Sequence, residues 1–568
     1  MRQLTYAVAA AFILFTFSAF FSACHDDGGI KLNQPISGDD TPDTPDDGDG
    51  DGDGDGDGDG DGDGDGDGDG DGDGDGNTDT RFVGTWISSY GDDLPVGNGR
   101  RQYALRIAIT RNGDALTGNG TMLRYFNNGP DAVDNPARTI SATGTATANE
   151  ATLTITGTSG TFTNNPIWYL RIADSRLVGM YAERDNSLVV QRSGHAIWHP
   201  AGSVDLNASW VAAFDDKFGT GSGFATRGRT AVATLTLNNN DITGLGSYVE
   251  QRANGASEIF DFNVGTGTLE GTQVRFTFTD FTPDNGEVDW FGYHSNNVIV
   301  AAYGQFNSSS ELARFGHATW YKAGDTTPAQ FDRDWTTSFG DSAAAGNLFA
   351  DYVMAMSGIN VVGNTVTGNV RVLQETDSDP RFVTYTIDNG TIVGNQMNMD
   401  IVRNGDRFSW NFRLAGGVLV GAYTHFNSSD EFVSRGNAEW RSGNASNLDG
   451  NSVASFTDTS TTNATENRAS QLALVTIGAV DSNDTFTGTG SLRLGGETNR
   501  RQFSLNGTVS DSGHIVMTWQ NGVDLFGNTV WNLRKAGNTL YGTYTNYASD
   551  NTSIEFQGHA TFVRASGN

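Results

Sequence analysis

The sequence predicts an all-β protein with four tandem antiparallel eight-stranded up-and-down β-barrels after a disordered N-terminal tether. Three observations predict this fold class. A short motif of the type GHATW recurs every 120 to 122 residues, turn-forming pairs recur at fixed places in each interval, and no stretch shows helical periodicity. Because solenoid coils and propeller blades repeat every ~20 to 50 residues, each of these longer repeats is expected to be a whole domain.

The first 23 residues have the pattern of a signal peptide. Arg2 precedes an apolar run from Ala7 to Phe21, which is shorter than the ~20 residues of a membrane span. The FSAC that follows resembles the lipobox of bacterial lipoproteins, although Phe21 stands where Leu is usual. This resemblance implies that Cys24 is lipidated and attaches the chain to a membrane. The alternative is an ordinary signal peptide followed by an incidental cysteine.

Residues 24–80 are predicted to be a lipidated, Asp/Gly-rich disordered linker. Residues 25–80 contain 22 Asp and one Lys, so they contribute −21 of the formal charge of −33. Fifteen consecutive Asp-Gly pairs have nothing to bury and repel one another, which favours an extended tether. We expect weak binding of divalent cations along this tract. An EF-hand is not predicted, because the repeat places Gly at loop position 12.

The four repeats are expected at residues 81–200, 206–323, 331–443 and 448–564. In each of them a Trp precedes a Tyr by 13 residues, and a turn-forming pair lies midway in three of the four. This spacing predicts that the Trp and the Tyr are direct neighbours across a hairpin. The predicted pairs are Trp168/Tyr181, Trp290/Tyr303, Trp410/Tyr423 and Trp531/Tyr544.

Strand-like runs in the first repeat are predicted at 82–90, 101–111, 115–125, 137–146, 150–157, 166–173, 176–184 and 187–199. Short turns join all eight, which favours a closed up-and-down barrel because closure removes exposed strand edges. A two-sheet sandwich is the alternative.

The histidine of the repeated motif is predicted to have a structural rather than a chemical role. Side chains alternate along a strand, so Gly194, Ala196 and Trp198 share one face and His195 lies on the other. The first face repeats better and is predicted to point inward. Asn437 replaces the histidine in the third repeat, and Asn is neither a general base nor a good metal ligand. No catalytic or metal site is predicted.

An Asp follows the first strand of each repeat and is predicted mainly to form a turn. If Trp86 lies opposite Trp198 in an antiparallel ladder, Asp92 lies opposite Arg192. The same register pairs Asp216 with Arg314 in the second repeat. In the third and fourth repeats the position of this arginine is occupied by Ser434 and Phe556, so the pair is predicted only in the first two. These barrel-end polar pairs are interpreted as structural ion pairs or, alternatively, as polar anchors for a ligand.

An opening GTW at Gly84 to Trp86 and a closing GHATW or GHATF strand resemble the avidin and lipocalin group of barrels. The resemblance implies a barrel whose mouth can hold one small ligand. Avidins have Asn and Ser where Ser88 and Asp92 stand, so biotin binding is not expected. The lipid anchor, glycine-rich leader and barrels are also similar in layout to surface lipoproteins of the transferrin-binding type.

These features favour a surface-anchored, non-enzymatic protein for multivalent binding or adhesion, with a glycan, a protein or a small hydrophobic ligand as partner. A small-ligand carrier with a pocket in each barrel is the alternative. We expect no cofactor, and no enzyme, because no nucleophile elbow, phosphate loop or paired zinc motif is present. A pI near 4.4 disfavours nucleic acid. His25 rather than Asp follows Cys24, so an outer-membrane or cell-surface location is expected.

Overall fold

A computed structural model describes residues 80–565 of the chain. Gaps in this range fall at 96–99, 127–136, 158–163, 204, 217, 220–227, 252–256, 282–285, 308–311, 346–348, 376–380, 444–446, 462–469, 498 and 521–526. The predicted signal peptide, Cys24 and the Asp-Gly tract lie outside the described residues. No helix within the described ranges is long and apolar enough to cross a membrane.

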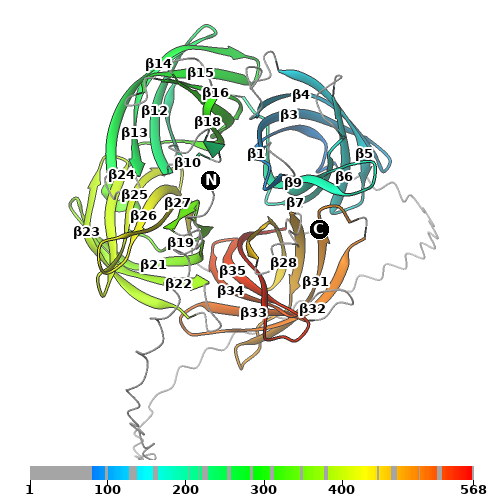
Figure 1. The fold of residues 1–568 in the computed structure, drawn as a ribbon, viewed down its shortest axis with the longest axis vertical. Helices are drawn as coiled ribbons and strands as arrows, with labels where there is room; N and C mark the ends of the chain where they lie inside the picture. The colour runs from blue at the N-terminus through cyan, green and yellow to red at the C-terminus, as the bar shows by residue number, and fades with distance from the viewer. Residues whose placement is uncertain are drawn as a thin grey trace, which may run out of the picture. The chain divides into compact units, whose positions relative to one another are not determined.

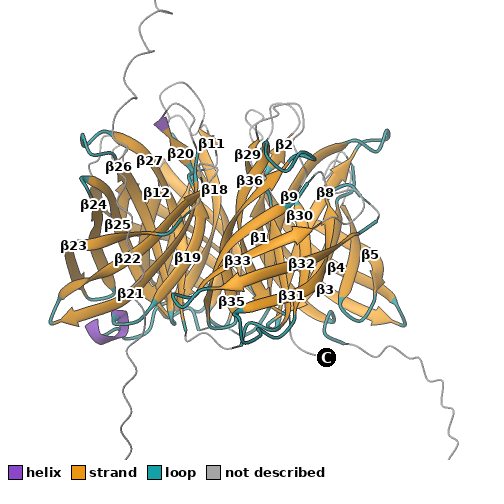
Figure 2. Cartoon of the chain, turned by 90° about the horizontal axis from the view of Figure 1, so that it is seen from below, coloured by secondary structure: helices purple, strands orange, loops and turns teal. Residues whose placement is uncertain are grey.

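The described residues form four closed antiparallel barrels, each of eight long strands (Figures 1 and 2). In the first barrel, each strand from β3 to β9 pairs with the next, β1 pairs with β3, and β1 also pairs with β9 to close the sheet. A short strand, β2, extends the pairing of β9. The bounds are β1 Gly84–Gly91, β2 Leu94–Pro95, β3 Arg101–Asn112, β4 Ala115–Phe126, β5 Arg138–Ala146, β6 Glu150–Gly157, β7 Ile167–Ala173, β8 Arg176–Arg184 and β9 Val190–Pro200.

The other three barrels repeat this topology. The second consists of β10 Ala208–Asp215, β11 Phe218–Gly219, β12 Gly228–Asn238, β13 Asp241–Gln251, β14 Ser257–Glu270, β15 Gln273–Phe281, β16 Gly286–Ser295, β17 Val298–Phe306 and β18 Leu312–Lys322. A 3-10 helix, η2, spans Pro328–Phe331 and precedes the third barrel.

The third barrel consists of β19 Trp335–Gly340, β20 Ala343–Ala344, β21 Asp351–Val362, β22 Thr365–Glu375, β23 Val383–Val393, β24 Gln396–Arg403, β25 Asp406–Ala415, β26 Val418–Phe426 and β27 Phe432–Ser442. The fourth consists of β28 Gly450–Phe456, β29 Asp458–Thr461, β30 Gln471–Ile477, β31 Thr485–Leu494, β32 Arg501–Val509, β33 His514–Gln520, β34 Thr529–Ala536, β35 Thr539–Tyr547 and β36 Ile554–Arg564. The predicted fold class is thus confirmed, and the sandwich alternative is wrong because the first and last strands pair.

The predicted Trp–Tyr hairpin is present in every barrel. Trp168 pairs directly with Tyr181 across β7 and β8, and the other three predicted pairs have the same register. Their ring centroids lie 4.6 to 5.0 Å apart. In the first hairpin, Asp174 and Ser175 both have positive φ, as a tight turn between twisted strands requires.

The register predicted for barrel closure is wrong by two residues. Trp86 lies opposite Pro200 rather than Trp198, and Trp210 lies opposite Lys322 rather than Trp320. Side chains along a strand alternate with a period of two residues, so a shift of two leaves the predicted inward and outward faces unchanged. The last strand continues two residues beyond its Trp, and this extension shifts the ladder.

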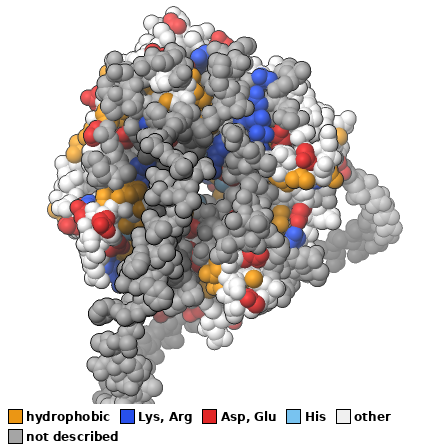
Figure 3. Space-filling view, in the orientation of Figure 1, with side chains coloured by type: hydrophobic (Ala, Val, Ile, Leu, Met, Phe, Trp, Pro, Cys, Tyr) orange, Lys and Arg blue, Asp and Glu red, His pale blue; other side chains and the backbone are white. Residues whose placement is uncertain are grey.

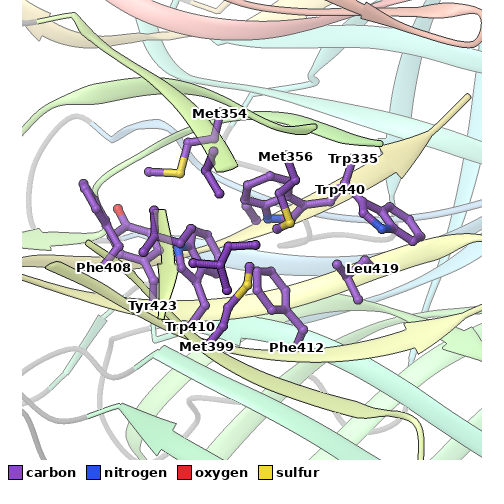
Figure 4. Packing of buried hydrophobic residues seen from close by; sticks show 14 of the residues in the cluster. Trp335, Met354, Met356, Met399, Phe408, Trp410, Phe412, Leu419, Tyr423 and Trp440 are labelled. Atoms are coloured by element: carbon purple, nitrogen blue, oxygen red, sulfur yellow. The ribbon is translucent and has the colours of Figure 1, made fainter. Parts of the chain in front are cut away.

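Large apolar side chains fill the described interior of each barrel. In the third barrel the buried set includes Trp335, Met354, Phe408, Trp410 and Trp440 (Figure 4). Trp410 and Trp440 make an edge-to-face contact with ring centroids 5.4 Å apart, and the other barrels have equivalent contacts at 4.9 to 5.1 Å. Burial of such rings is the main driving force for each domain.

The barrels also pack against one another through outward-facing apolar residues. The early strands of one barrel contact the late strands of the next barrel in the chain. Ile87 and Leu123 of the first barrel lie in one buried cluster with Tyr293 and Phe315 of the second. Strands β10 and β12 contact β26 in the same way, and β19 and β21 contact β35.

The fourth barrel contacts the first with the same polarity, so the contacts form a closed cycle. Val453 and Leu472, on β28 and β30, pack against Tyr169, Val178 and Met180, on β7 and β8. Each contact joins a first-strand surface to a last-strand surface, which is a heterologous, head-to-tail interface. Head-to-tail interfaces between four similar units close when each step rotates by about a quarter turn.

Candidate functional site

The predicted pair of Asp92 and Arg192 meets at one end of the first barrel. Arg192 Nε lies 3.3 Å from Asp92 Oδ2, and the Asp92 side chain is fully buried. Tyr181 donates a hydrogen bond of 2.5 Å to Asp92 Oδ1, and the backbone N–H of Arg101 donates one of 2.9 Å to Oδ2. Glu183 lies within 3.8 Å of both arginines. Two acids and two arginines therefore lie together at this end.

The second barrel has a more completely buried version of the same cluster. Arg314 Nε lies 3.6 Å from Asp216 Oδ2, and Arg229 Nη1 lies 2.8 Å from Oδ1. Tyr303 donates a hydrogen bond of 2.8 Å to Asp216, and Glu250 accepts one of 3.3 Å from Arg229. Arg314 was predicted as the partner of Asp216 from the closing register, whereas Arg229 was not predicted because it lies on β12 and not on the closing strand.

The third and fourth barrels keep the carboxylate and the tyrosine but have no arginine at the position of Arg192. Tyr423 donates a hydrogen bond of 2.6 Å to Asp341, and Tyr544 donates one to Asp458. The feature shared by all four barrels is therefore an aspartate that accepts a tyrosine hydroxyl, and this aspartate is buried in the first three barrels. Asp92 and Asp341 also each accept a hydrogen bond of 2.9 Å from a backbone N–H nine residues further on, across the loop that follows the first strand. The hydrogen bond from the Tyr of the Trp–Tyr hairpin is an additional contact that the sequence pattern did not indicate.

Burial changes the acidity of two of these carboxyls. It raises the pKa of Asp92 to about 7, against the opposing effects of the Tyr181 hydrogen bond and the Arg192 charge. Burial likewise raises the pKa of Asp341 to about 6, against the hydrogen bond from Tyr423. The first and third barrels thus each have an acid that titrates near neutral pH.

The outward-facing histidine of the repeated motif lies at the interfaces between barrels. His317 Nδ1 of the second barrel lies 2.5 Å from Gln102 Oε1 of the first, and His559 Nδ1 of the fourth lies 2.6 Å from Asp351 Oδ1 of the third. Asn437 of the third barrel donates a hydrogen bond to Asp215 of the second. The motif therefore marks a repeated contact between domains, which supports its structural interpretation.

The remaining interface uses the same histidine position with a different acceptor. His195 Nδ1 lies 2.6 Å from Asp93 Oδ2 in its own barrel. The same carboxylate oxygen accepts hydrogen bonds of 3.0 Å from Thr457 and 3.4 Å from Ser470, both in the fourth barrel. Asp93 thus connects the histidine to the neighbouring barrel at the point where the cycle closes.

Space for these acceptors comes from glycine on the adjacent strand. Gly91 lies opposite Gln102, and a Cβ built on it would lie 2.4 Å from the Gln102 amide. Gly340 lies opposite Asp351, with a corresponding distance of 2.7 Å. In the second barrel the two strands exchange these roles. The acceptor, Asp215, is on the first long strand, and the glycine opposite it, Gly228, is on the next.

A cavity of about 640 Å³ lies where the first three barrels meet. Its walls include Arg176 of the first barrel, Val298 and Tyr321 of the second, and Val418 and Arg441 of the third. A smaller cavity of about 190 Å³ lies between the second and third barrels. Neither cavity could be predicted from the sequence, because their walls come from residues that are far apart in the chain.

A polar cluster shared between barrels adjoins the larger cavity, whose lining includes its members Tyr321 and Arg441. Glu439 accepts hydrogen bonds from Tyr321 and from Arg441, whose Nε lies 2.8 Å from Oε1. Burial lowers the pKa of His199 to about 4, and the nearby charges of Arg176 and Arg441 lower it further against the effect of Glu439. His199 is therefore neutral at physiological pH.

No family model matches the chain, and no curated protein matches it significantly. Among solved structures, the chain is similar to a protein of unknown function of the DUF3598 family from Nostoc punctiforme. The identity is 10%, the match covers 64% of this chain and 97% of that one, and the TM-score is 0.15.

Two structures of transferrin-binding protein B are similar at the same level. A double mutant from Haemophilus parasuis is 8% identical, with 69% of this chain and 83% of that chain covered and a TM-score of 0.17. The isotype 1 protein from serogroup B Neisseria meningitidis is 10% identical, with coverage of 70% and 84% and a TM-score of 0.17. At these scores the likenesses carry no argument about function.

Proposed function

We propose that this chain is a surface-anchored, non-enzymatic lipoprotein that binds a polymer, a cell surface or a protein through several individually weak sites. Lipid on Cys24 would hold it at a bacterial outer membrane or cell surface, and the acidic linker would give the barrels reach. The observation that carries the proposal is that four filled barrels are joined into one closed body. Binding sites must then lie on the loops and between the domains.

The filled interiors disfavour the alternative of a small-ligand carrier with a pocket in each barrel. A carrier barrel needs an apolar space of several hundred Å³. Here Trp168 of the first barrel contacts both Tyr181 and Trp198, with ring centroids 5.0 Å apart in each contact. The two cavities noted above lie between barrels rather than within one.

The closed body favours multivalent binding. Independent barrels on flexible linkers would lose orientational freedom each time two of them engaged one ligand. Barrels held by apolar interfaces present their loops at fixed separations, so a second contact costs little further entropy. On the face drawn in Figure 3, acidic, basic and hydrophobic side chains occur in small separate groups. This distribution suits several modest contacts.

A density series tests the proposal. The full chain is attached through its N-terminus to a surface and presented with an array of glycans and extracellular proteins, each printed at high and low density. We expect at least one ligand to be retained ~100-fold more strongly at high density, because linked sites gain avidity of that order. Equal affinity at both densities, or uptake of about four fluorescent fatty-acid molecules per chain, would contradict the proposal.

A further inference from the structure

The cavity between the first three barrels is bounded by hairpin turns and by the segment that joins two domains. The tight turn at Gly416 and Gly417 has positive φ at both residues, which holds the third barrel's hairpin close to the space. The connecting residues 323–326 form part of the rim. At about 640 Å³ the cavity falls within the ~300 to 1,000 Å³ of small-molecule sites.

Its lining is cationic in a chain that is acidic as a whole. Four basic side chains line the space and one acidic side chain, Asp325, accompanies them. The basic residues are Arg176, Lys322, Arg333 and Arg441. They come from three barrels and a linker, so only the assembled body brings them together.

Two of these cations are held by exposed partners that a ligand can replace. Arg176 lies 3.4 Å from Asp174, whose side chain is 53% exposed, and Lys322 lies 3.4 Å from Asp205, whose side chain is 62% exposed. Exposed pairs of this kind contribute little to stability. Arg333 is itself exposed at the cavity. Bidentate pairing of an arginine with a ligand carboxylate is stronger than such contacts.

The rest of the lining suits a sugar ring. Val298 and Ala323, both partly exposed, offer apolar surface, while the side chains of Asn297 and Gln330 offer hydrogen-bond donors and acceptors. Sugars present both a carbon-bound hydrogen face and a rim of hydroxyls. A lining that combines apolar, amide and guanidinium groups therefore fits an acidic saccharide better than a bare inorganic anion or a lipid.

We propose that this cavity binds a carboxylated saccharide of one or two units, with its carboxylate paired to Arg176 and Arg333. The inference rests on the proposed binding function, for which it supplies the class of ligand. Lys322 reaches the same space from the second barrel. Arg441, held by Glu439, forms the cationic floor of the site.

The test is a calorimetric titration of the full chain with digalacturonic acid, with the neutral disaccharide galactobiose and with inorganic phosphate. We expect one molecule of digalacturonic acid to bind per chain, at least ~10-fold more tightly than galactobiose, since hydrogen bonds to a charged group are stronger than those between neutral groups. Arg176→Gln and Arg333→Gln should each weaken binding ~10-fold. Arg333 is exposed, so its substitution leaves the fold intact.

Arg564→Gln is the matched control for Lys322→Gln. Arg564 occupies the equivalent closing position in the fourth barrel, opposite Ser452 as Lys322 is opposite Trp210, but lies outside the cavity lining. Lys322→Gln should weaken binding and Arg564→Gln should not. Absence of digalacturonate binding, equal effects of the two variants, or binding of phosphate alone would overturn the inference. Density-dependent capture of another ligand would then still support the proposed function.

Discussion

His559 of the fourth barrel places its Nδ1 atom 2.6 Å from Oδ1 of Asp351 in the third barrel. Asp351 is buried, so its carboxylate depends on this partner for hydrogen bonding. Equivalent contacts from His317 and Asn437 join the other consecutive barrels. The most conspicuous motif in the sequence thus serves the assembly of domains.

Replacement of His559 tests this role directly. His559→Ala leaves a buried carboxylate without its donor, so local opening of β21 and β36 should become easier by ~1 to 3 kcal/mol. Hydrogen exchange of peptides from the two strands measures it. His559→Asn should retain most of the protection, because Asn437 makes the same contact naturally. Identical exchange in the Ala and Asn variants would contradict the role.

The tyrosine at each barrel end should stabilise its own barrel. In Tyr181→Phe, Asp92 loses a hydrogen bond of 2.5 Å in a buried setting. We expect a loss of ~1 to 3 kcal/mol in the local stability of the first barrel, measured by hydrogen exchange. In an Asp92→Asn background, Tyr181→Phe should reduce the local stability by less, because a buried neutral amide loses less free energy than a buried carboxylate when its hydrogen bond is removed. Additive costs in the double variant would argue against direct coupling.

The first barrel should be more stable in mild acid than at slightly alkaline pH. Burial raises the pKa of Asp92 from 3.8 to about 7, so between these values the folded barrel binds a proton that the unfolded chain does not. The contribution of this carboxyl to the free energy of unfolding is therefore fully present below pH ~4. It decreases by ~1.4 kcal/mol per pH unit as the pH rises to ~7. Hydrogen exchange corrected for pH should reveal this slope in the first barrel, and Asp92→Asn should abolish it. A slope that survives the substitution would assign the effect to another group.

Loss of the arginine from the second barrel end should be costly. Arg314 and Asp216 are both buried, so Arg314→Ala leaves a buried charge with one fewer partner and should destabilise this barrel by ~3 to 5 kcal/mol. Arg192→Ala should destabilise the first barrel less, since Arg192 is 13% exposed. Ser434→Ala, at the same position of the third barrel, is the control and should cost ~1 kcal/mol or less. Comparable losses in Arg314→Ala and Ser434→Ala would refute the buried pair.

The hairpins could be predicted because their signals are local. A Trp and a Tyr separated by 13 residues around a turn determine one register, as Trp168 and Tyr181 show. The closure register joins strands about a hundred residues apart, and the pattern around Trp198 does not reveal that His199 and Pro200 extend the ladder. The sequence pattern revealed only which residues alternate to the inside and the outside of the barrel. For this reason the inward faces were predicted correctly although the register was not.

The contacts between barrels could not be predicted from the motif alone. The partner of the histidine is Gln102 in one interface and Asp351 in another, and the second barrel supplies Asp215 from the neighbouring strand. One signal was available. Strands such as Val298–Phe306 are apolar on both faces, and all but their end residues are buried, as expected when a sheet is covered on both sides.

The central claim is that the fourth barrel closes onto the first, and one engineered disulfide tests it most directly. Ser193 Oγ in the first barrel lies 3.3 Å from Ser470 Oγ in the fourth, although the residues are 277 positions apart. In a Cys24→Ser chain, Ser193→Cys with Ser470→Cys should form an intramolecular disulfide, because side chains whose terminal atoms already touch need only a small movement to reach the Cβ separation of ~3.5 to 4.5 Å that the bond requires. Peptide mapping under non-reducing conditions should recover the two peptides linked, whereas Ser193→Cys with Ser434→Cys of the third barrel should leave free thiols. Two freely alkylated cysteines in the first variant, or links only between separate chains, would contradict the closed arrangement.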